Sequence, residues 1–370
     1  MISTKTASKI YFITILCSFL SITSLPINPI YPIGAFAIGV VILIVMSRLR
    51  INNFTLVTIL FSLAFLLSQL EGIDYVSSHI GYPNGPVYLT SLLFVYSILL
   101  ATCISETSRM LKEKTRTTLQ IKGLRIAIFF FLIELITRVL NYREGEGLLY
   151  AFKYSVLYFD SNFTGLVLLS LVCFLIYKNE QTATVFNKIK RILTVMLFLT
   201  ISRGAIIGYL IANFYLNNQR KLKIRSLYIV VISLVCLAIL YLLYSFGLVN
   251  LINIDGSFNS KFFIINKAIH FYEEQDFMMH LFGIGMGNSK ELIDIFAHNI
   301  FVTALIEMGW IGTVLFVAYV LYTVRVSHGK SLIIWVPALI SGISLFSAYS
   351  PFLFIFNAII CCEEREKSRI

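Results

Sequence analysis

The sequence is poor in charged residues and has no long polar region. Only 13% of its 370 residues are charged and 58% are hydrophobic, with a mean hydropathy of +0.84. Because an average soluble domain has about 25% charged residues, this composition excludes a soluble globular protein. Neither half of the chain is polar, which also excludes one anchor carrying a soluble domain. The chain is therefore predicted to be an all-α polytopic membrane protein.

Cysteine is also scarce and carries no pattern. The six cysteines lie in apolar runs or at the C-terminal end of the chain, without the spacing of a disulfide framework or of a CxxC metal site. Redox chemistry and a cysteine-bound metal are therefore not expected.

Apolar runs of about 15–22 residues predict the membrane spans. They lie near residues 10–25, 29–47, 53–70, 87–105, 125–141, 161–177, 226–247, 309–325, 331–347 and 350–362. The first resembles a signal peptide but lacks a cleavage pattern, so it is expected to remain as a span. A further apolar stretch, 188–217, is interrupted at Arg203 and flanked by basic clusters. Because both clusters favour the cytoplasm, it is predicted to be two short spans with Arg203 at the far turn, giving about twelve in total.

The positive charges follow this topology. Of the 30 lysines and arginines, 23 fall on the cytoplasmic side, so the net charge of +11 needs no nucleic acid as partner. We expect one membrane domain, 1–370, with both termini cytoplasmic. A cytoplasmic loop is predicted at 106–124, a short outward loop at 71–86, and a large outward loop at 248–308.

His298 in the large loop is the first candidate site residue. Residues 299–308 place apolar side chains at helical spacing and predict an interfacial helix, which Asn299 could cap. Free N–H groups at the start of that helix would favour an anion near Ala297 and His298. The alternative is a histidine that only satisfies the backbone at the helix start.

Two further segments could bind phosphate. Arg203, at the outer mouth of a two-span hairpin, can hold a diphosphate by bidentate hydrogen bonds, unless it only contacts lipid headgroups. The glycine-rich turns around 255–261, which end at Lys261, and at Gly283–Gly287 could bring backbone N–H groups to phosphate. They lack the strand and helix context of a nucleotide fold, which excludes a dinucleotide site.

Together these segments resemble the O-antigen polymerase and O-antigen ligase superfamily of bacterial inner-membrane glycosyltransferases. The resemblance covers roughly residues 155–325 at the level of motifs. The matching residues are Leu199–Gly208 with its Ser-Arg-Gly triplet, Gly283–Gly287, and His298-Asn299 with Glu307, Gly309 and Gly312, together with the Asp-x-Asn signature at Asp160 and Asn162. The family usually has an arginine in the large loop, where this chain has Lys261. A lysine ammonium is a compact charge and lacks the planar set of N–H donors of an arginine.

The resemblance implies a GT-C-like fold and transfer of a sugar chain from undecaprenyl diphosphate, with inversion at the anomeric carbon. Arg203 and Lys261 would bind the diphosphate. His298 would accept the proton of the acceptor hydroxyl or hydrogen-bond the diphosphate. Glu307 is an alternative base.

In the same scheme Asp160, Asn162 and Asn299 would position the substrate, with Asp160 as a further alternative base.

Glu134 lies near mid-span, one turn from Arg138, a spacing that permits a structural ion pair. We expect no cofactor and no metal, although acidic residues crowd the large loop at Glu273, Glu274, Asp276 and Asp294.

Within the family, a polymerase adds the growing chain to a new lipid-linked repeat unit, and a ligase moves the finished chain to lipid A-core. We favour the polymerase, which would imply a chain-length regulating partner protein. A flippase or other transporter of lipid-linked sugars is the alternative from another class. The candidate residues gather on one outer face instead of at mid-membrane, which favours the enzyme.

Overall fold

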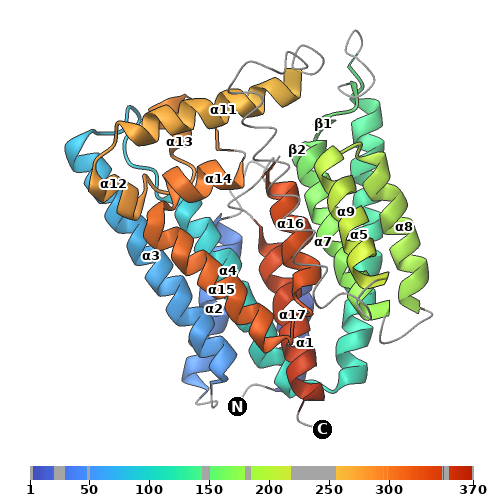
Figure 1. Cartoon of the computed structure of the whole chain (residues 1–370). Coiled ribbons are helices and arrows are strands. Elements are labelled where there is room, and N and C mark those ends of the chain that lie inside the picture. Colours follow the sequence, from blue (N-terminus) through green and yellow to red (C-terminus); the bar gives the residue numbers. More distant parts are fainter. Residues whose placement is uncertain are drawn as a thin grey trace.

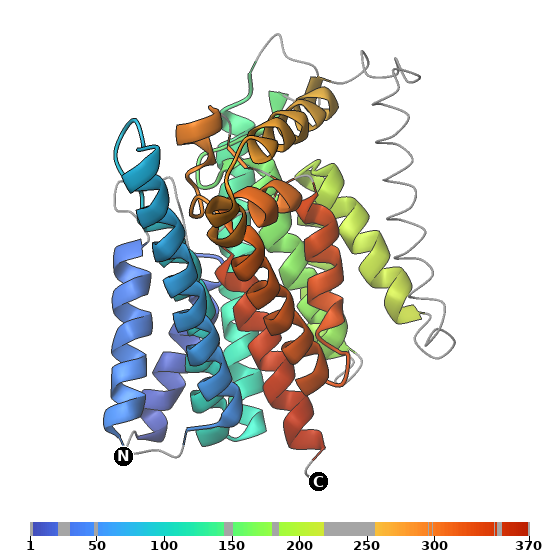
Figure 2. The same ribbon diagram turned by 60° about the vertical axis from the view of Figure 1, so that its left-hand side comes forward.

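A computed structural model of the chain (Figures 1 and 2) describes residues 3–20, 30–47, 51–143, 151–179, 185–217, 256–294, 296–297, 299–343, 345 and 350–368. Long helices run side by side as a bundle, and both chain termini lie at one end of it. Helix α11 (Gly256–Glu273) lies across the opposite end, called the α11 end below.

The bundle consists of helices that overlap the predicted spans, and several of them extend beyond the apolar runs. They are α1 (Thr4–Cys17), α2 (Ile30–Met46), α3 (Asn53–His79), α4 (Leu89–Met110), α5 (Glu113–Leu140), α7 (Ser161–Asn179), α8 (Val185–Leu199), α9 (Arg203–Asn217), α15 (Gly309–Val326), α16 (Leu332–Gly342) and α17 (Pro351–Lys367). The short elements at the α11 end are β1 (Tyr154–Ser155), β2 (Phe159–Asp160), α12 (Phe277–Phe282), α13 (Ser289–Ile293), α14 (Ile300–Val302) and the π-helical η2 (Thr303–Glu307). The two strands pair antiparallel, with Tyr154 opposite Asp160.

Four of the described helices, α3, α4, α7 and α15, are long and apolar enough to cross a membrane. The shorter helices α2 and α16 are also apolar. The predicted class, an all-α membrane protein, is therefore confirmed. The number of twelve spans and the GT-C-like arrangement stay predictions, and the span expected at 226–247 lies outside the described residues.

Aromatic side chains fill the centre of the bundle around α17, in which every residue from Pro351 to Cys362 is buried. The ring of Phe94 in α4 lies 4.8 Å from that of Phe65 in α3 and 5.6 Å from that of Phe354 in α17. Aromatic contacts of this geometry add to the free energy gained by burying the rings. They fix α3, α4 and α17 relative to one another.

The predicted loop at 106–124 is wrong. Helix α4 continues to Met110 and α5 begins at Glu113, so only two residues connect the helices. Charged side chains here are buried by pairing, as Arg116 donates from Nη1 to Glu366 Oε1 at 2.5 Å. A hydropathy pattern scores these charged residues as polar even when they are paired. The sequence pattern therefore predicted both helices to be too short.

The predicted outward loop at 71–86 is also too long, because α3 runs on to His79. Its last turns carry Gly72, Ile73 and Val76, which are buried within α3. A methyl group on Gly72 would meet the Phe282 carbonyl oxygen at 3.0 Å, so α3 packs directly against the end of α12. Contact with the large loop extends the helix beyond its apolar run.

Residues 188–217 lie in two helices, as predicted, with the break at Thr200–Ser202. Ile201 has a φ of 55° there, a conformation that ends α8 before α9 begins. Helix α7 packs against this break, since a methyl group on Gly165 would meet Ser202 Cβ at 2.7 Å. The structure therefore puts Arg203 at the start of α9 and at the α11 end of the bundle (Figure 1).

Candidate functional site

The Gly283–Gly287 turn joins α12 to α13 and lies against η2 and α4. A methyl group on Gly283 would meet the Glu307 carbonyl oxygen at 2.6 Å, and one on Gly287 would meet Thr90 Oγ1 at 2.5 Å. Gly283 has a φ of 76°, where L-residues are strained. The turn is thus packed closely against α4 and η2, and the phosphate contact expected from its glycines stays a prediction.

Gln69 of α3, which the sequence analysis did not single out, holds this crossing together. Its side chain is fully buried. Oε1 accepts hydrogen bonds from Met286 N at 2.8 Å and from Ser91 Oγ at 3.2 Å, while Nε2 donates to the Glu307 carbonyl at 3.4 Å. The only signal in the sequence was an amide within a long apolar run, a position where polar groups need partners.

Glu307 ends η2 with its side chain only 4% exposed. Its Oε1 accepts a hydrogen bond from the Ser289 backbone nitrogen at 3.4 Å. Burial raises the pKa of this carboxyl to about 7, although hydrogen bonds from Ser289 and Gly287 offset part of the effect. Glu307 is therefore no water-facing carboxylate, and it can take up or release a proton near neutral pH.

Ser289 also connects Glu307 to the segment in which His298 was predicted to act. Its Oγ accepts a hydrogen bond from Ala297 N at 2.9 Å, and Thr303 Oγ1 donates to the Ala297 carbonyl at 3.3 Å. His298 itself lies outside the described residues. One serine thus contacts both the buried carboxyl and the residue that precedes His298 in the chain.

Asn299 caps the following helix, as predicted. Its Oδ1 accepts from Phe301 N at 2.8 Å, and its Nδ2 donates to the Ile343 carbonyl at 2.6 Å, just beyond α16. The interfacial helix expected at 299–308 is α14 followed by η2. The π-helical turn of η2 is a rare feature that is often found at functional sites, and the Met308 N–H closes it on the Thr303 carbonyl at 2.8 Å.

Asp160 and Asn162 lie at the start of α7. Asp160 Oδ1 accepts a hydrogen bond from Asn162 N at 2.8 Å, and Lys153 Nζ lies 3.5 Å from Asp160 Oδ2. Since α7 packs on the α8–α9 break, this Asp-x-Asn turn and Arg203 lie at the same end of neighbouring helices. The Arg203 side chain is exposed.

The predicted ion pair in α5 is confirmed. Arg138 Nε lies 3.7 Å from Glu134 Oε1, and both side chains are buried. Thr164 Oγ1 donates to the same carboxylate oxygen at 3.0 Å. Nε and Nη1 of Arg138 are buried without a hydrogen-bond partner among the described residues, which is costly for a guanidinium.

Lys261 lies in α11, and its side chain is outside the described residues. The prediction of a glycine-rich turn at 255–261 is wrong, because α11 begins at Gly256.

Helix α16 contacts both the Asn299 segment and α9, the helix that begins at Arg203. Its end receives the Asn299 hydrogen bond, and its Pro337 carbonyl lies 3.1 Å from where a methyl group on Gly208 of α9 would be.

An apolar hollow of about 370 Å³ opens beside η2. It is lined by Phe301, Ala304, Leu305, Trp310, Thr313 and Val314. The one hydroxyl in this lining, Thr313 Oγ1, donates to the Ala304 carbonyl at 2.7 Å. The hollow thus suits an apolar chain better than a sugar.

Comparison with known protein families agrees with the resemblance. Residues 190–317 match the family described as Wzy_C, O-antigen ligase. The matched segment runs from α8 into α15 and includes Arg203, the Gly283–Gly287 turn, Asn299 and Glu307. No curated protein matches the chain. The match covers about a third of the chain and supports its similarity to the O-antigen polymerase and ligase superfamily.

Proposed function

We propose that this chain is a glycosyltransferase, an O-antigen polymerase that transfers a growing polysaccharide from undecaprenyl diphosphate to a new lipid-linked repeat unit. One observation supports this most. Within the family segment, the buried Glu307 carboxyl has a pKa near 7 and is connected through Ser289 to the chain next to His298. Proton transfer at neutral pH needs such a group.

The donor would lie at the α11 end, which the positive-inside rule assigns to the periplasm, with both termini in the cytoplasm of a bacterium. Arg203 and Lys261 would hold the diphosphate by charge-assisted hydrogen bonds. The apolar hollow beside η2 would take part of the polyprenyl chain. Asp160, Asn162 and Asn299 would position the sugars or the elements that bind them.

In the reaction, the acceptor hydroxyl oxygen attacks the anomeric carbon of the donor sugar with inversion. A new C–O bond forms, the C–O bond to the diphosphate breaks, and undecaprenyl diphosphate leaves. The hydroxyl proton goes to His298 or to Glu307, and the residue that does not accept it positions the diphosphate or the acceptor. The cationic residues replace a metal ion in this scheme, so transfer should continue in chelator.

A ligase is the second candidate, because the matched family is described as O-antigen ligase. It would use the same donor and the same α11 end but deliver the chain to lipid A-core. A non-enzymatic flippase of lipid-linked sugars is the third candidate. A raised carboxyl pKa beside a family motif favours chemistry over transport. The polymerase would also work with a chain-length regulating protein.

The lipopolysaccharide banding pattern of a strain that lacks the protein tests the proposal. A polymerase predicts core carrying a single repeat unit, whereas a ligase predicts bare core with long chains accumulating on undecaprenyl diphosphate. Complementation would compare the wild type with His298→Ala, Glu307→Gln and Arg203→Ala at matched protein levels. Arg191→Ala, an exposed arginine of α8 in the same family segment, is the control and should restore the full ladder.

Each outcome bears on a distinct part of the proposal. A full ladder from His298→Ala, Glu307→Gln and Arg203→Ala would overturn the site assignment and leave the family match unaffected. A normal pattern in the null strain would overturn both enzyme candidates. If only one of His298→Ala and Glu307→Gln abolishes the ladder, transfer depends on that residue and not on the other.

A further inference from the structure

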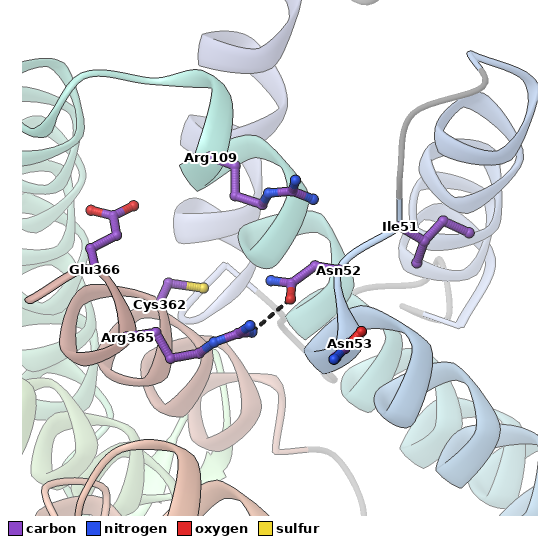
Figure 3. Close-up of a pocket in the computed structure, with 7 residues that line it drawn as sticks. All are labelled: Ile51, Asn52, Asn53, Arg109, Cys362, Arg365 and Glu366. Atoms are coloured by element: carbon purple, nitrogen blue, oxygen red, sulfur yellow. Dashed lines mark hydrogen bonds between the residues drawn. The ribbon is translucent and has the colours of Figure 1, made fainter. Parts of the chain in front are cut away.

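A polar cavity lies at the other end of the bundle, near both chain termini. The start of α3, the end of α4 and the last turns of α17 enclose about 210 Å³ (Figure 3). Its polar lining consists of Asn52, Asn53, Arg109, Arg365 and Glu366. A water molecule takes up about 30 Å³ of liquid, so the space accommodates a group of several heavy atoms.

The carboxylates around this cavity are already paired with cations other than Arg365. Glu366 forms a bidentate pair with Arg116, with Nη1–Oε1 at 2.5 Å and a second contact between Nη2 and Oε2. Glu106 pairs with Arg109 at 3.2 Å and is also bound by the Asn52 N–H at 2.9 Å. The neighbouring carboxylates of α17 are paired as well, Glu363 with Lys178 and Glu364 with Lys367.

Arg365 is the exception among the charged residues of this end of α17. Within the described part of the chain, it forms no ion pair with a carboxylate, and its one hydrogen bond joins Nη1 to Asn52 Oδ1 at 2.6 Å. A guanidinium has five N–H donors, so most of its donors are left for a ligand. Figure 3 shows Arg365 reaching toward Asn52, with the Arg109 guanidinium extending into the neighbouring space.

The start of α3 adds to the positive potential. Asn53 is the first residue of this 27-residue helix, and its side chain is exposed beside the cavity. The N-terminus of a helix carries a partial positive charge that favours anions. The Arg365 guanidinium and this helix start therefore face a space whose nearby carboxylates are already paired, Glu106 with Arg109 among them.

We propose that this cavity binds one phosphate group, either the phosphodiester of an anionic lipid headgroup or free phosphate. Arg365 supplies the main contact, by planar N–H donors that match phosphate geometry, and the Arg109–Glu106 pair borders the same space. The site lies at the opposite end of the bundle from Glu307 and Arg203. It is separate from the proposed glycosyl transfer and does not depend on it.

Ligand binding by the purified full-length protein tests this proposal in two arms. The first arm measures how many phosphatidylglycerol molecules stay bound in native mass spectrometry, with phosphatidylcholine as the neutral reference lipid. The second arm titrates inorganic phosphate against chloride at constant ionic strength and follows the thermal unfolding midpoint. Arg365→Gln should weaken binding about tenfold or more in the arm that contains the true ligand, equal to about 1.4 kcal/mol. Arg125→Gln, an exposed arginine of α5 outside the cavity, should match the wild type.

A second variant guards against misfolding. Asn53→Asp puts a negative charge beside the cavity at the first position of α3, where an acidic residue favours the helix. It should therefore keep or raise the unfolding midpoint and still weaken phosphate binding. If Arg365→Gln does not fold, this variant decides the question alone.

The arms separate the two sources of phosphate. Loss of phosphatidylglycerol in Arg365→Gln without any response to inorganic phosphate identifies a lipid site, and a phosphate response lost in Arg365→Gln identifies a free-anion site. If Arg365→Gln and Asn53→Asp bind both probes as Arg125→Gln does, the proposal is overturned. Arg109 and Arg365 would then only offset the negative C-terminal ends of α4 and α17.

Discussion

Gly283 and Gly309 pack backbone against backbone, so that a methyl group on Gly283 would meet the Gly309 nitrogen at 2.6 Å. This contact joins the end of α12 to the start of α15, the helix that enters the bundle after Glu307. Both glycines have positive φ angles, 76° and 63°. Two glycines far apart in the sequence therefore set the position of the buried carboxyl.

Replacing Gly283 with alanine should destabilise the protein strongly. The added methyl would press on the backbone at Glu307 and Gly309, which cannot move aside as a flexible side chain can. Gly81→Ala is the matched control, since Gly81 has a φ of 79° but open space around its Cα. It carries only the backbone strain, about 1–2 kcal/mol. Unfolding midpoints of the two variants in one detergent measure the difference, and equal midpoints would contradict the close packing.

Glu307→Gln should change how stability depends on pH. Because the pKa of Glu307 is raised to about 7 from 4.5, the folded wild type holds this proton more tightly than the unfolded chain. Wild-type stability should therefore fall as pH rises from about 4.5 to about 7 and level off above. Near pH 8 the variant should be more stable, by up to about 3 kcal/mol, and near pH 4.5 the two should be similar.

Thermal unfolding across this pH range measures the effect. Glu113→Gln, at an exposed carboxyl at the start of α5, is the control and should follow the wild-type curve. A Glu307→Gln curve parallel to that of the wild type would show that Glu307 titrates in the ordinary range.

Arg203→Lys should lower transfer by one to two orders of magnitude if Arg203 holds the diphosphate. Lysine keeps the charge but not the planar fork of donors, so a bidentate contact becomes a single one. Arg191→Lys, an exposed arginine of α8, makes the same chemical change away from the site and should leave the rate unchanged. Chain extension in membranes with a lipid-linked repeat unit gives the rates. Equal rates for the two variants would assign Arg203 to lipid headgroups.

Glu134→Leu should destabilise the protein by about 3–5 kcal/mol, because it leaves the Arg138 guanidinium buried without its counter-ion. The double variant Glu134→Leu/Arg138→Leu should recover part of that loss. Thr164→Val removes only a neutral donor to the same carboxylate and should cost about 1 kcal/mol. Unfolding midpoints of the four proteins form the comparison. A double variant no more stable than Glu134→Leu would show that the two charges do not stabilise each other.

The sequence by itself determined the helical membrane architecture, the break before Arg203 and the cap at Asn299. These features depend on apolar run length, on charges that flank a run and on one side chain bonding to N–H groups two or three residues ahead. The Glu134–Arg138 pair belongs here too, since a spacing of four brings both side chains to one helix face. All of these are local, so the order of residues suffices.

Only the tertiary structure decided which polar residues are buried and what they meet. The extension of α3 to His79 and the two-residue link between α4 and α5 depend on partners in α12 and α17. Gln69 became a central residue because Met286 and Glu307 lie beside it. Packing of distant segments also buries Glu307, which raises its pKa. The same packing leaves Arg365 without a carboxylate partner within the described residues. Desolvation and ion pairing depend on distant segments packed against a residue, and spacing along the chain does not encode them.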